Sequence, residues 1–339
     1  MIKARAGDII LVSCGTYKEY DILVKPGVSL WSGTLQPDCV TIDAGGRGRC
    51  LVLSSADSTT SIVGITFVGG RSIGSEDNQG GAILCEDSAA RFTRCSFRNN
   101  SAISGGAVAV IGSQGPQFES CDFTDNEAQV GGAIVWRASS GDFSKCTFAS
   151  NSAESSGGAI ATTAGRLDIF DSLFSSNESG NSGGAVSLTA TESQIEDSIF
   201  FANQGGIAGG AVASAQSEVS FRQCTFHAND TDGHATIFSS QDSNPVFDHC
   251  LFTGSANPMF TGDSSAYLIT RTNILPLDGE PWPAIISELA GTAGNLALDP
   301  LFCAPETGDL HLRDNSPCLP SSNSQQIGAL TKGCGAHFP

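Results

Sequence analysis

Short apolar runs, broken every few residues by Gly, Ser, Thr and Asn, follow one another along most of the chain. Runs of this length, bounded by turn-forming residues, are typical of short β-strands. No stretch of about 10–12 residues carries the apolar stripe of an amphipathic helix, which recurs about every 3.6 residues. The hydrophobic pattern therefore predicts an all-β chain of many short strands.

The pattern repeats every 25 or 26 residues through the middle of the chain. Gly-Gly-Ala followed by Ile or Val begins at Gly80, Gly105, Gly131, Gly157, Gly183 and Gly209. Phe-x-x-Asn begins at Phe97, Phe123, Phe148, Phe174, Phe200 and Phe226. Periods of about 20–50 residues indicate solenoids, propellers or arrays, and a propeller blade needs about 40. The shorter unit predicts a single-stranded right-handed parallel β-helix of roughly ten or more coils.

Equivalent residues of successive coils are expected to stack about 4.8 Å apart, which is the spacing of strands in a sheet. The predicted internal ladders comprise the six Phe residues above and two further columns. The Cys column is Cys95, Cys121, Cys146, Cys224 and Cys250, and the Asn column is Asn100, Asn126, Asn151, Asn177, Asn203 and Asn229. We interpret the cysteines as free buried thiols, since parallel side-chain vectors disfavour disulfides. The asparagines are interpreted as a hydrogen-bonded turn ladder, so their two glycosylation sequons should stay unmodified.

The chain divides into three regions of one continuous solenoid domain. Residues 1–70 have strand patterns without the strict motif and are interpreted as N-terminal coils, with a truncated cap as one interpretation. Residues 71–255 form the regular repeats, and residues 256–339 are assigned to C-terminal coils and an irregular cap. A cap is needed because an open solenoid end exposes strand edges and core. Disulfides are expected in the terminal regions rather than in the ladder, with the pairing left open.

Composition narrows the possible partners. The 17 basic and 35 acidic residues give a net charge of −18, which argues against nucleic acid and anionic membrane surfaces. No stretch reaches the roughly 20 apolar residues of a membrane span. The opening MIKARAGD lacks the apolar core of a signal peptide, which leaves a cytosolic protein or a missing leader as interpretations.

Two families share these motifs. The opening Gly7-Asp8-Ile9-Ile10-Leu11-Val12 and the later Gly64-Ile65-Thr66-Phe67 resemble the first coils of pectin-lyase-like β-helix proteins. The tetrapeptide repeats resemble those of the chlamydial polymorphic outer-membrane proteins. That resemblance implies a surface-exposed β-helix with an adhesive role, whereas the pectin-lyase-like fold hosts lyases, glycosidases and esterases.

Catalytic residues of a β-helix are expected in columns that point outward. On the strand after Gly-Gly-Ala the expected outward columns are small and neutral, apart from Glu86 and Arg137. The first of these columns is Leu84, Ala109, Val135, Ala161, Ser187, Ala213 and Ile237. The second is Glu86, Ile111, Arg137, Thr163, Thr189, Ala215 and Ser239. A second polar column precedes the Cys ladder and consists of Arg94, Ser120, Lys145, Asp171, Asp197, Gln223 and His249.

Asp171 and Asp197, with Glu196 beside the second, are the best paired carboxylates in that column. Such a pair suits Ca²⁺ binding or glycosidic chemistry, which needs two carboxyl groups about 5–9.5 Å apart. We name these three residues and Arg137 as catalytic candidates, and Asp171 and Asp197 as a candidate Ca²⁺ site. No other cofactor is expected. His227, His234 and His249 lack the spacing of a metal motif.

The function that we infer is that of a secreted or cell-surface protein with a structural, adhesin-like binding role. Its expected partner is a polysaccharide, or a glycan or protein of a host or cell surface. The alternative is a polysaccharide-active enzyme, either a pectate-lyase-like lyase or a glycosidase, so whether the chain is an enzyme stays open. A cleft at residues 71–79, 112–116 or 230–245, holding acids with Arg71, Arg137 or Arg166, would favour the enzyme.

Overall fold

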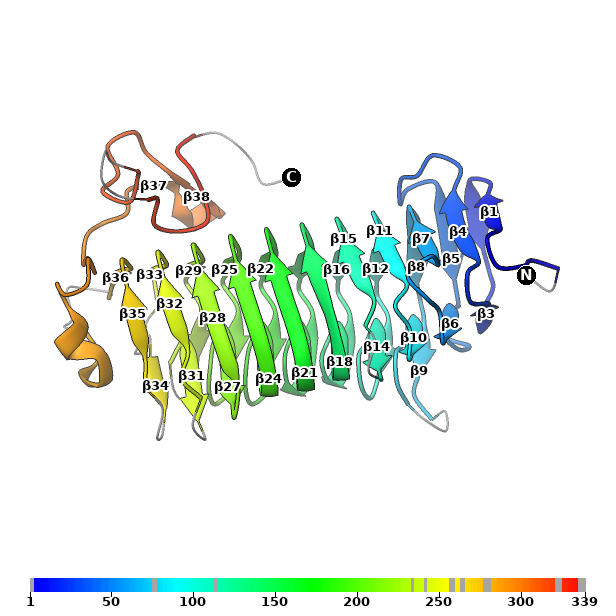
Figure 1. Cartoon of the computed structure of the whole chain (residues 1–339), viewed down its shortest axis with the longest axis horizontal. Helices are drawn as coiled ribbons and strands as arrows, with labels where there is room; N and C mark the ends of the chain where they lie inside the picture. The colour runs from blue at the N-terminus through cyan, green and yellow to red at the C-terminus, as the bar shows by residue number, and fades with distance from the viewer. Residues whose placement is uncertain are drawn as a thin grey trace.

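The chain folds into a long parallel β-solenoid, in which successive coils stack along one axis (Figure 1). This computed structural model describes residues 3–74, 78–112, 115–232, 235–240, 243–255, 260–262, 266–276, 282–320 and 325–334. Within these residues, no helix is long and apolar enough to cross a bilayer. The predicted all-β solenoid with a small C-terminal cap is confirmed.

One coil shows how the repeat makes a turn of the solenoid. β14 (Val108–Ile111) and β15 (Gln117–Glu119) belong to sheet A, β16 (Asp122–Thr124) to sheet B and β17 (Glu127–Val130) to sheet C. Each strand pairs in parallel with its counterpart one coil away. Short strands separated by tight turns follow from the alternation of apolar runs with Gly, Ser and Asn.

Within the described residues, sheet A has 18 strands, sheet B has 11 and sheet C has seven. The other strands of sheet A are β1 (Ile9–Val12), β3 (Ile22–Val24), β4 (Ser29–Ser32), β6 (Leu51–Ser54), β7 (Ser61–Val63), β10 (Ile83–Glu86), β11 (Arg91–Thr93), β18 (Ile134–Ser144), β21 (Ile160–Phe170), β24 (Val186–Glu196), β27 (Val212–Ala215), β28 (Glu218–Arg222), β31 (Ile237–Ser240), β32 (Val246–Asp248), β34 (Phe260–Gly262) and β35 (Leu268–Thr270). Those of sheet B are β2 (Gly15–Tyr17), β5 (Val40–Asp43), β8 (Ile65–Val68), β12 (Ser96–Arg98), β19 (Thr147–Ala149), β22 (Leu173–Ser175), β25 (Ile199–Phe201), β29 (Thr225–His227), β33 (Leu251–Thr253) and β36 (Asn273–Leu275). Those of sheet C are β9 (Arg71–Ser72), β13 (Ser101–Ala102), β20 (Ser152–Ser156), β23 (Glu178–Ser179), β26 (Gln204–Gly205) and β30 (Asp230–Thr231).

Phenylalanine rings fill the centre of the solenoid. Phe123 and Phe148 are direct neighbours in the register of sheet B, and their ring centroids lie 4.7 Å apart with planes 4° from parallel. The ladder continues through Phe174, again at 4.7 Å. A second column on sheet A meets the first edge-on, as Phe143 does with Phe148 at 5.3 Å. Stacked and edge-on pairs are both favourable arrangements of aromatic quadrupoles.

The asparagine column forms a continuous hydrogen-bonded ladder beside the rings. Asn151 Nδ2 donates to Asn177 Oδ1 at 2.9 Å and to the Phe123 carbonyl at 2.9 Å. Asn126 donates from both its backbone N–H and its Nδ2 to Asn151 Oδ1. Because Asn177 and Asn229 are 0% exposed, both sequon side chains are buried in these turns.

Replacing Asn151 by Ala should lower the free energy of unfolding by about 1–2 kcal/mol, because buried donors on Asn126 lose their acceptor. Urea unfolding followed by circular dichroism measures the change. The matched control is Asn181→Ala, since Asn181 is exposed and its side chain donates only a long 3.4 Å bond to Ser155. Equal losses in both variants would count against the ladder.

The cysteines separate into two groups, as expected. Two disulfides, Cys14–Cys39 and Cys303–Cys334, lie in the terminal regions. The ladder cysteines are buried free thiols. Burial raises the pKa of the Cys121 thiol well above its ordinary value, and neighbouring thiols add to the effect. The ladder thiols therefore act as small apolar groups in the core.

The expected outward columns of sheet A need one correction. Leu84, Ala109 and Val135 do lie outside the main core, where they form a small buried cluster against which Ile111 and Val130 pack. Further along sheet A, Ile237 pairs in register with Val212, which is an inward position. The columns continue instead at 238 and 240, and the assignment of Ile237 and Ser239 was wrong by one residue. A 25-residue step without the Gly-Gly-Ala motif caused the error.

The C-terminal region first adds a coil and then closes the end. β34, β35 and β36 pair in parallel with the preceding coil. The 3₁₀ helix η2 (Ala284–Leu289) follows, and Ile286 and Trp282 pack against the end of the main core. The Trp282 indole donates to the Ile274 carbonyl at 3.1 Å. This segment supplies the apolar cover that an open solenoid end needs.

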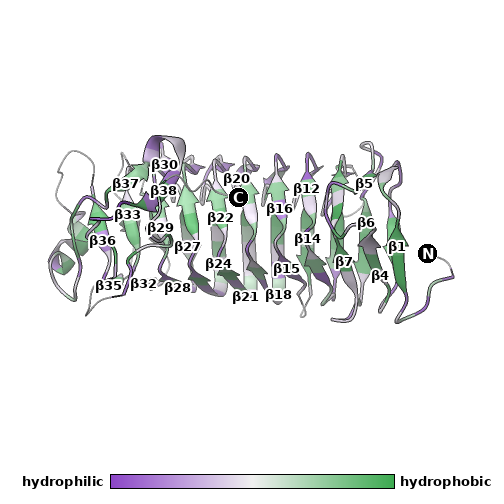
Figure 2. Cartoon of the chain, turned by 90° about the horizontal axis from the view of Figure 1, so that it is seen from above, coloured by the Kyte–Doolittle hydropathy of each residue, from purple (hydrophilic) through white to green (hydrophobic). Residues whose placement is uncertain are grey.

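The chain then folds back along the side of the solenoid. We call residues 296–320 and 325–334 the C-terminal strap; they include β37 (Phe302–Ala304), η3 (Pro305–Thr307) and β38 (Asp309–Leu312). β37 and β38 form a small antiparallel sheet. Figures 1 and 2 both place this sheet beside the strands of sheet B near β29 and β33. Ala329 N donates to Thr225 Oγ1 at 2.9 Å, although 104 residues separate them.

Candidate functional site

A column of left-handed residues runs along the edge where sheet A turns into sheet B. Its members have φ between 48° and 54°, and each occupies the same place in its coil. This turn column is Arg94, Ser120, Lys145, Asp171, Asp197, Gln223, His249 and Arg271. Each residue occupies one turn, so successive side chains are expected about 4.8 Å apart. The column therefore presents one polar side chain per coil.

The strap covers the adjacent outer face of sheet B. Ile199 and Leu251 on that face form a second buried cluster with Phe302, Leu310 and Ile327 of the strap. Leu173, Phe201, Leu296, Leu319, Ala329 and Leu330 pack against this cluster. Burial of this apolar surface holds the strap on the solenoid. The strap and the turn column together form the walls of two cavities.

The first cavity, which we call the acidic recess, has a volume of about 350 Å³. Lys145, Asp171 and Asp197 of the turn column line it on three adjacent coils, and Ala329 and Leu330 of the strap form the facing wall. The structure thus places both candidate carboxylates in one recess. Glu196 lies beside it on β24, where it pairs in register with Arg222.

The carboxyl groups influence one another across coils. Partial burial raises the pKa of Asp197, and the charges of Asp171 and Glu196 raise it further, while Arg222 opposes them. Like charges on adjacent coils favour protonation of one group or attraction of a cation. The recess can therefore hold a shared proton or a positive group between Asp171 and Asp197.

The second cavity, which we call the basic recess, has a volume of about 690 Å³. Its polar wall consists of Arg222, Asp248, His249 and Arg271. The rest of its lining consists of Gly294 and Leu296, on the coil that follows Arg271, and of Pro317, Gln325 and Ile327 of the strap. Gly328 N of the strap donates to the His249 carbonyl at 2.7 Å, so the strap contacts the turn column directly.

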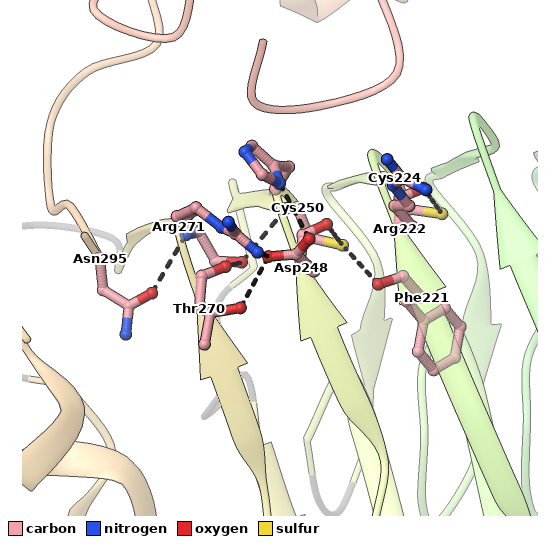
Figure 3. A network of polar contacts seen from close by, with 10 residues as sticks. Phe221, Arg222, Cys224, Asp248, Cys250, Thr270, Arg271 and Asn295 are labelled. Carbon is pink, nitrogen blue, oxygen red and sulfur yellow. Dashed lines mark hydrogen bonds and ion pairs between the residues drawn. The ribbon is translucent and has the colours of Figure 1, made fainter. Parts of the chain in front are cut away.

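Asp248 is the centre of a dense polar network in the basic recess (Figure 3). Arg271 donates to its Oδ1 from Nε at 2.9 Å and from Nη2 at 2.7 Å, and Thr270 Oγ1 donates to the same oxygen at 2.7 Å. A third partner is His249, whose Nδ1 is hydrogen-bonded to Oδ2 at 3.0 Å. Although burial raises the pKa of Asp248, the hydrogen bonds from these three residues outweigh it and hold the pKa below its usual range. Asp248 is therefore an anion.

Sequence comparison supplies the family of this fold. A profile described as a right-handed β-helix region matches residues 80–275, more than half of the chain. The chain belongs to the right-handed β-helix family. No curated protein sequence matches it.

One of the solved structures that align with this chain shares its fold along nearly the whole chain. The crystal structure of pectate lyase Pel9A aligns with a TM-score of 0.51 and 12% identity, covering 98% of this chain and 90% of that one. A mutant of the PL6-family alginate lyase AlyGC aligns with a TM-score of 0.49 and 14% identity, covering 97% of this chain and 55% of that one. Likeness at such identities concerns the fold, because one fold hosts many activities.

The other residues singled out in the sequence lie elsewhere on the β-helix. Arg137 donates to Gln79 Oε1 and Ser104 Oγ, both at 3.2 Å, and so stabilises one corner of the β-helix. Arg166 pairs with Asp168 at 2.8 Å and lines a separate cavity from Arg71. The three arginines suggested for a catalytic cleft therefore do not gather around Asp171 and Asp197.

The histidines of the β-helix do not form one cluster. His227 stacks on Phe201 at 5.9 Å and meets Phe302 edge-on at 5.5 Å, so it lies beneath the strap. His249 belongs to the basic recess, and His234 lies outside the described residues. Among the residues that the structure does describe, no three His, Cys, Asp or Glu side chains converge as a metal site.

Three residues of the basic recess were not predicted from the sequence. Arg222 and Asp248 immediately precede turn-column positions, and Arg271 belongs to the column itself. Arg271 was missed because the step from Cys250 to its successor Thr272 is 22 residues, shorter than the repeat. The sequence did contain one sign that another segment covers the outer face of sheet B. Leu173 and Ile199 are apolar although they occupy outward positions of sheet B.

Proposed function

We propose that this β-helix protein binds a polysaccharide at the two recesses beside the strap and has an adhesin-like role at a cell surface. One observation carries the proposal: three consecutive coils present Lys145, Asp171 and Asp197 in one recess, and the next three present Arg222, His249 and Arg271 in the other. A polymer of similar units suits a wall that repeats once per coil. Recesses of several hundred Å³ with a few converging polar groups are typical of ligand sites.

The similarity in fold to a pectate lyase supports a saccharide ligand. Pectate lyase Pel9A, whose name states its activity on pectate, has the same fold across 98% of this chain. The apolar strap side chains Leu296, Ile327 and Leu330 add to this argument, since they offer surface to the carbon face of a sugar ring. Hydroxyl groups of the sugar would meet the turn column opposite.

An extracellular or cell-surface location is part of the proposal. The disulfides Cys14–Cys39 and Cys303–Cys334 favour an oxidising compartment, where such bonds persist. The second bond closes part of the strap that lines both recesses, so a reducing environment would weaken that wall. This location also agrees with the likeness of the tetrapeptide repeats to those of surface-displayed proteins.

A second candidate is a polysaccharide lyase or glycosidase that uses the acidic recess. The observation in its favour is the pair Asp171 and Asp197 on adjacent coils, with the pKa of Asp197 raised by burial and by its acidic neighbours. A carboxyl group that holds its proton can act as a general acid while its partner stays ionised. Lys145 lines the same recess and could provide a base.

Binding and catalysis can be separated in one experiment. The purified protein is titrated with polygalacturonate, alginate and a neutral glucan, and the same mixtures with Ca²⁺ are followed for unsaturated products and new reducing ends. We expect binding of at least one polysaccharide and no product. Absence of binding to every polysaccharide would contradict the proposed function.

Product formation would instead establish the enzyme, provided that it depends on the recess. Asp197→Asn should then abolish it, while Asp125→Asn should not. Asp125 is a matched control because it is also an exposed residue in the left-handed region, with φ 53° against 49° for Asp197, on another edge of the β-helix.

A further inference from the structure

The basic recess carries charge of the opposite sign to the protein as a whole. The chain has a net charge of −18, yet the lining of this recess has two guanidinium groups and one carboxylate. Asp248 is fully engaged, because it accepts from Thr270 and Arg271 and is hydrogen-bonded to His249. Its negative charge is therefore balanced by Arg271 within the network.

Arg222 is the cation of the recess that takes no part in this network. It lies on β28 and pairs in register with Asp248 of the next coil, as Figure 3 shows for the neighbouring strands. Among the residues that the structure describes, its guanidinium makes no hydrogen bond or ion pair, and its side chain is exposed. It acts at longer range on Asp197, where it opposes the rise in pKa that burial, Asp171 and Glu196 cause. An arginine fork with its donors unused matches an anionic oxygen group bidentately.

The rest of the lining of the recess is largely apolar. Leu296, Pro317 and Ile327 line this volume of about 690 Å³ together with Gly294, Gln325 and the charged residues. A ligand that fits this lining has both an anionic group and a carbon-rich face. A monosaccharide unit that bears a carboxylate or a sulfate has both features, and this volume is ample for one such unit.

We propose that the basic recess is the subsite that selects an anionic sugar unit, with Arg222 pairing its carboxylate or sulfate and Leu296, Pro317 and Ile327 contacting its ring. Asp248 is a positioning residue, because it orients Arg271 and His249 toward the same space without being free to contact the ligand's anion. This inference rests on the proposed polysaccharide binding and names the chemical class of that ligand.

The test compares saccharides of one length and different charge by isothermal titration calorimetry. The ligands are an oligogalacturonate, its neutral methyl ester and a sulfated neutral oligosaccharide. The wild-type protein should bind the better of the two anionic ligands at least about tenfold more tightly than the ester, since a hydrogen bond to a charged group typically contributes this much. Whether carboxylate or sulfate binds more tightly identifies the source of the anion.

Variants locate the preference. Arg222→Gln should weaken binding of the anionic ligand about tenfold and leave binding of the ester unchanged, whereas Arg222→Lys should keep part of the preference because it keeps the charge. Arg94→Gln is the matched control, since Arg94 is an exposed arginine of the turn column that lines neither recess. Circular dichroism and melting confirm that each variant is folded.

Two results would overturn the subsite and leave polysaccharide binding intact. One is equal affinity of the wild-type protein for the ester and both anionic ligands. The other is an equal loss of ester and anion binding in Arg222→Gln, which would indicate a general contact. Failure of every ligand to bind would overturn the proposed function together with the subsite.

Discussion

Replacing Phe148 by Ala is expected to lower the free energy of unfolding by about 3–5 kcal/mol, the range typical of large aromatic truncations in cores. Phe148 is 0% exposed and stacks at 4.7 Å on both Phe123 and Phe174. Its removal leaves a gap that a stack held at strand spacing on both sides cannot close, because parallel strands fix the backbone. The loss is therefore that of buried area plus an unrelaxed cavity.

Urea unfolding monitored by circular dichroism measures the effect of Phe148→Ala. Ile207→Ala serves as control, since Ile207 is 54% exposed and its truncation should change stability by no more than about 0.5 kcal/mol. A loss below about 1 kcal/mol for Phe148→Ala would show that the aromatic ladder does not hold the coils in register.

Gly132→Ala is expected to cost at least about 3 kcal/mol, although only one methyl group is added. A Cβ at Gly132 would collide with the Gly158 carbonyl oxygen of the next coil and lie 2.6 Å from the Ser152 carbonyl oxygen. Both obstacles are backbone atoms within the ladder, so neither can move alone. The cost arises from contact between coils, since Gly132 is not among the residues with positive φ.

A comparison with Gly46→Ala separates the two reasons for which glycine is needed here. Gly46 has φ 73°, but nothing lies within 4 Å of an added Cβ. Its replacement should cost only the strain of the left-handed conformation, about 1–2 kcal/mol. Soluble yield and melting temperature report both variants, and a Gly132→Ala protein as stable as Gly46→Ala would refute the close approach of coils.

Most of the fold could be predicted because the repeat sets the geometry of each coil directly. The clash at Gly132 explains why Gly-Gly recurs, and the ring stack through Phe123 and Phe148 explains why Phe recurs. Both constraints act between neighbours at strand spacing, so they appear in the sequence as a fixed period. Where the motif lapsed, as before Ile237, the predicted register slipped by one residue.

The candidate site was less predictable, because only half of it obeys the period. Asp171, Asp197 and His249 belong to the turn column and were found from the repeat. The strap wall was not found, since the contact between Ala329 and Thr225 joins residues 104 apart in sequence. No spacing rule predicts where an irregular segment will lie. The apolar outward positions in sheet B show that a cover exists without showing which segment provides it.

That long contact changes how the molecule should lose its structure. In a solenoid each coil touches only its neighbours, so stability is close to a sum of nearest-neighbour terms and unzipping can begin at either end. The strap spans several coils at once, because its apolar side chains pack on Leu173, Ile199 and Leu251. Terminal coils on that side are thereby coupled into one cooperative unit, whereas coils toward the N-terminus beyond the strap keep the freedom to fray one at a time.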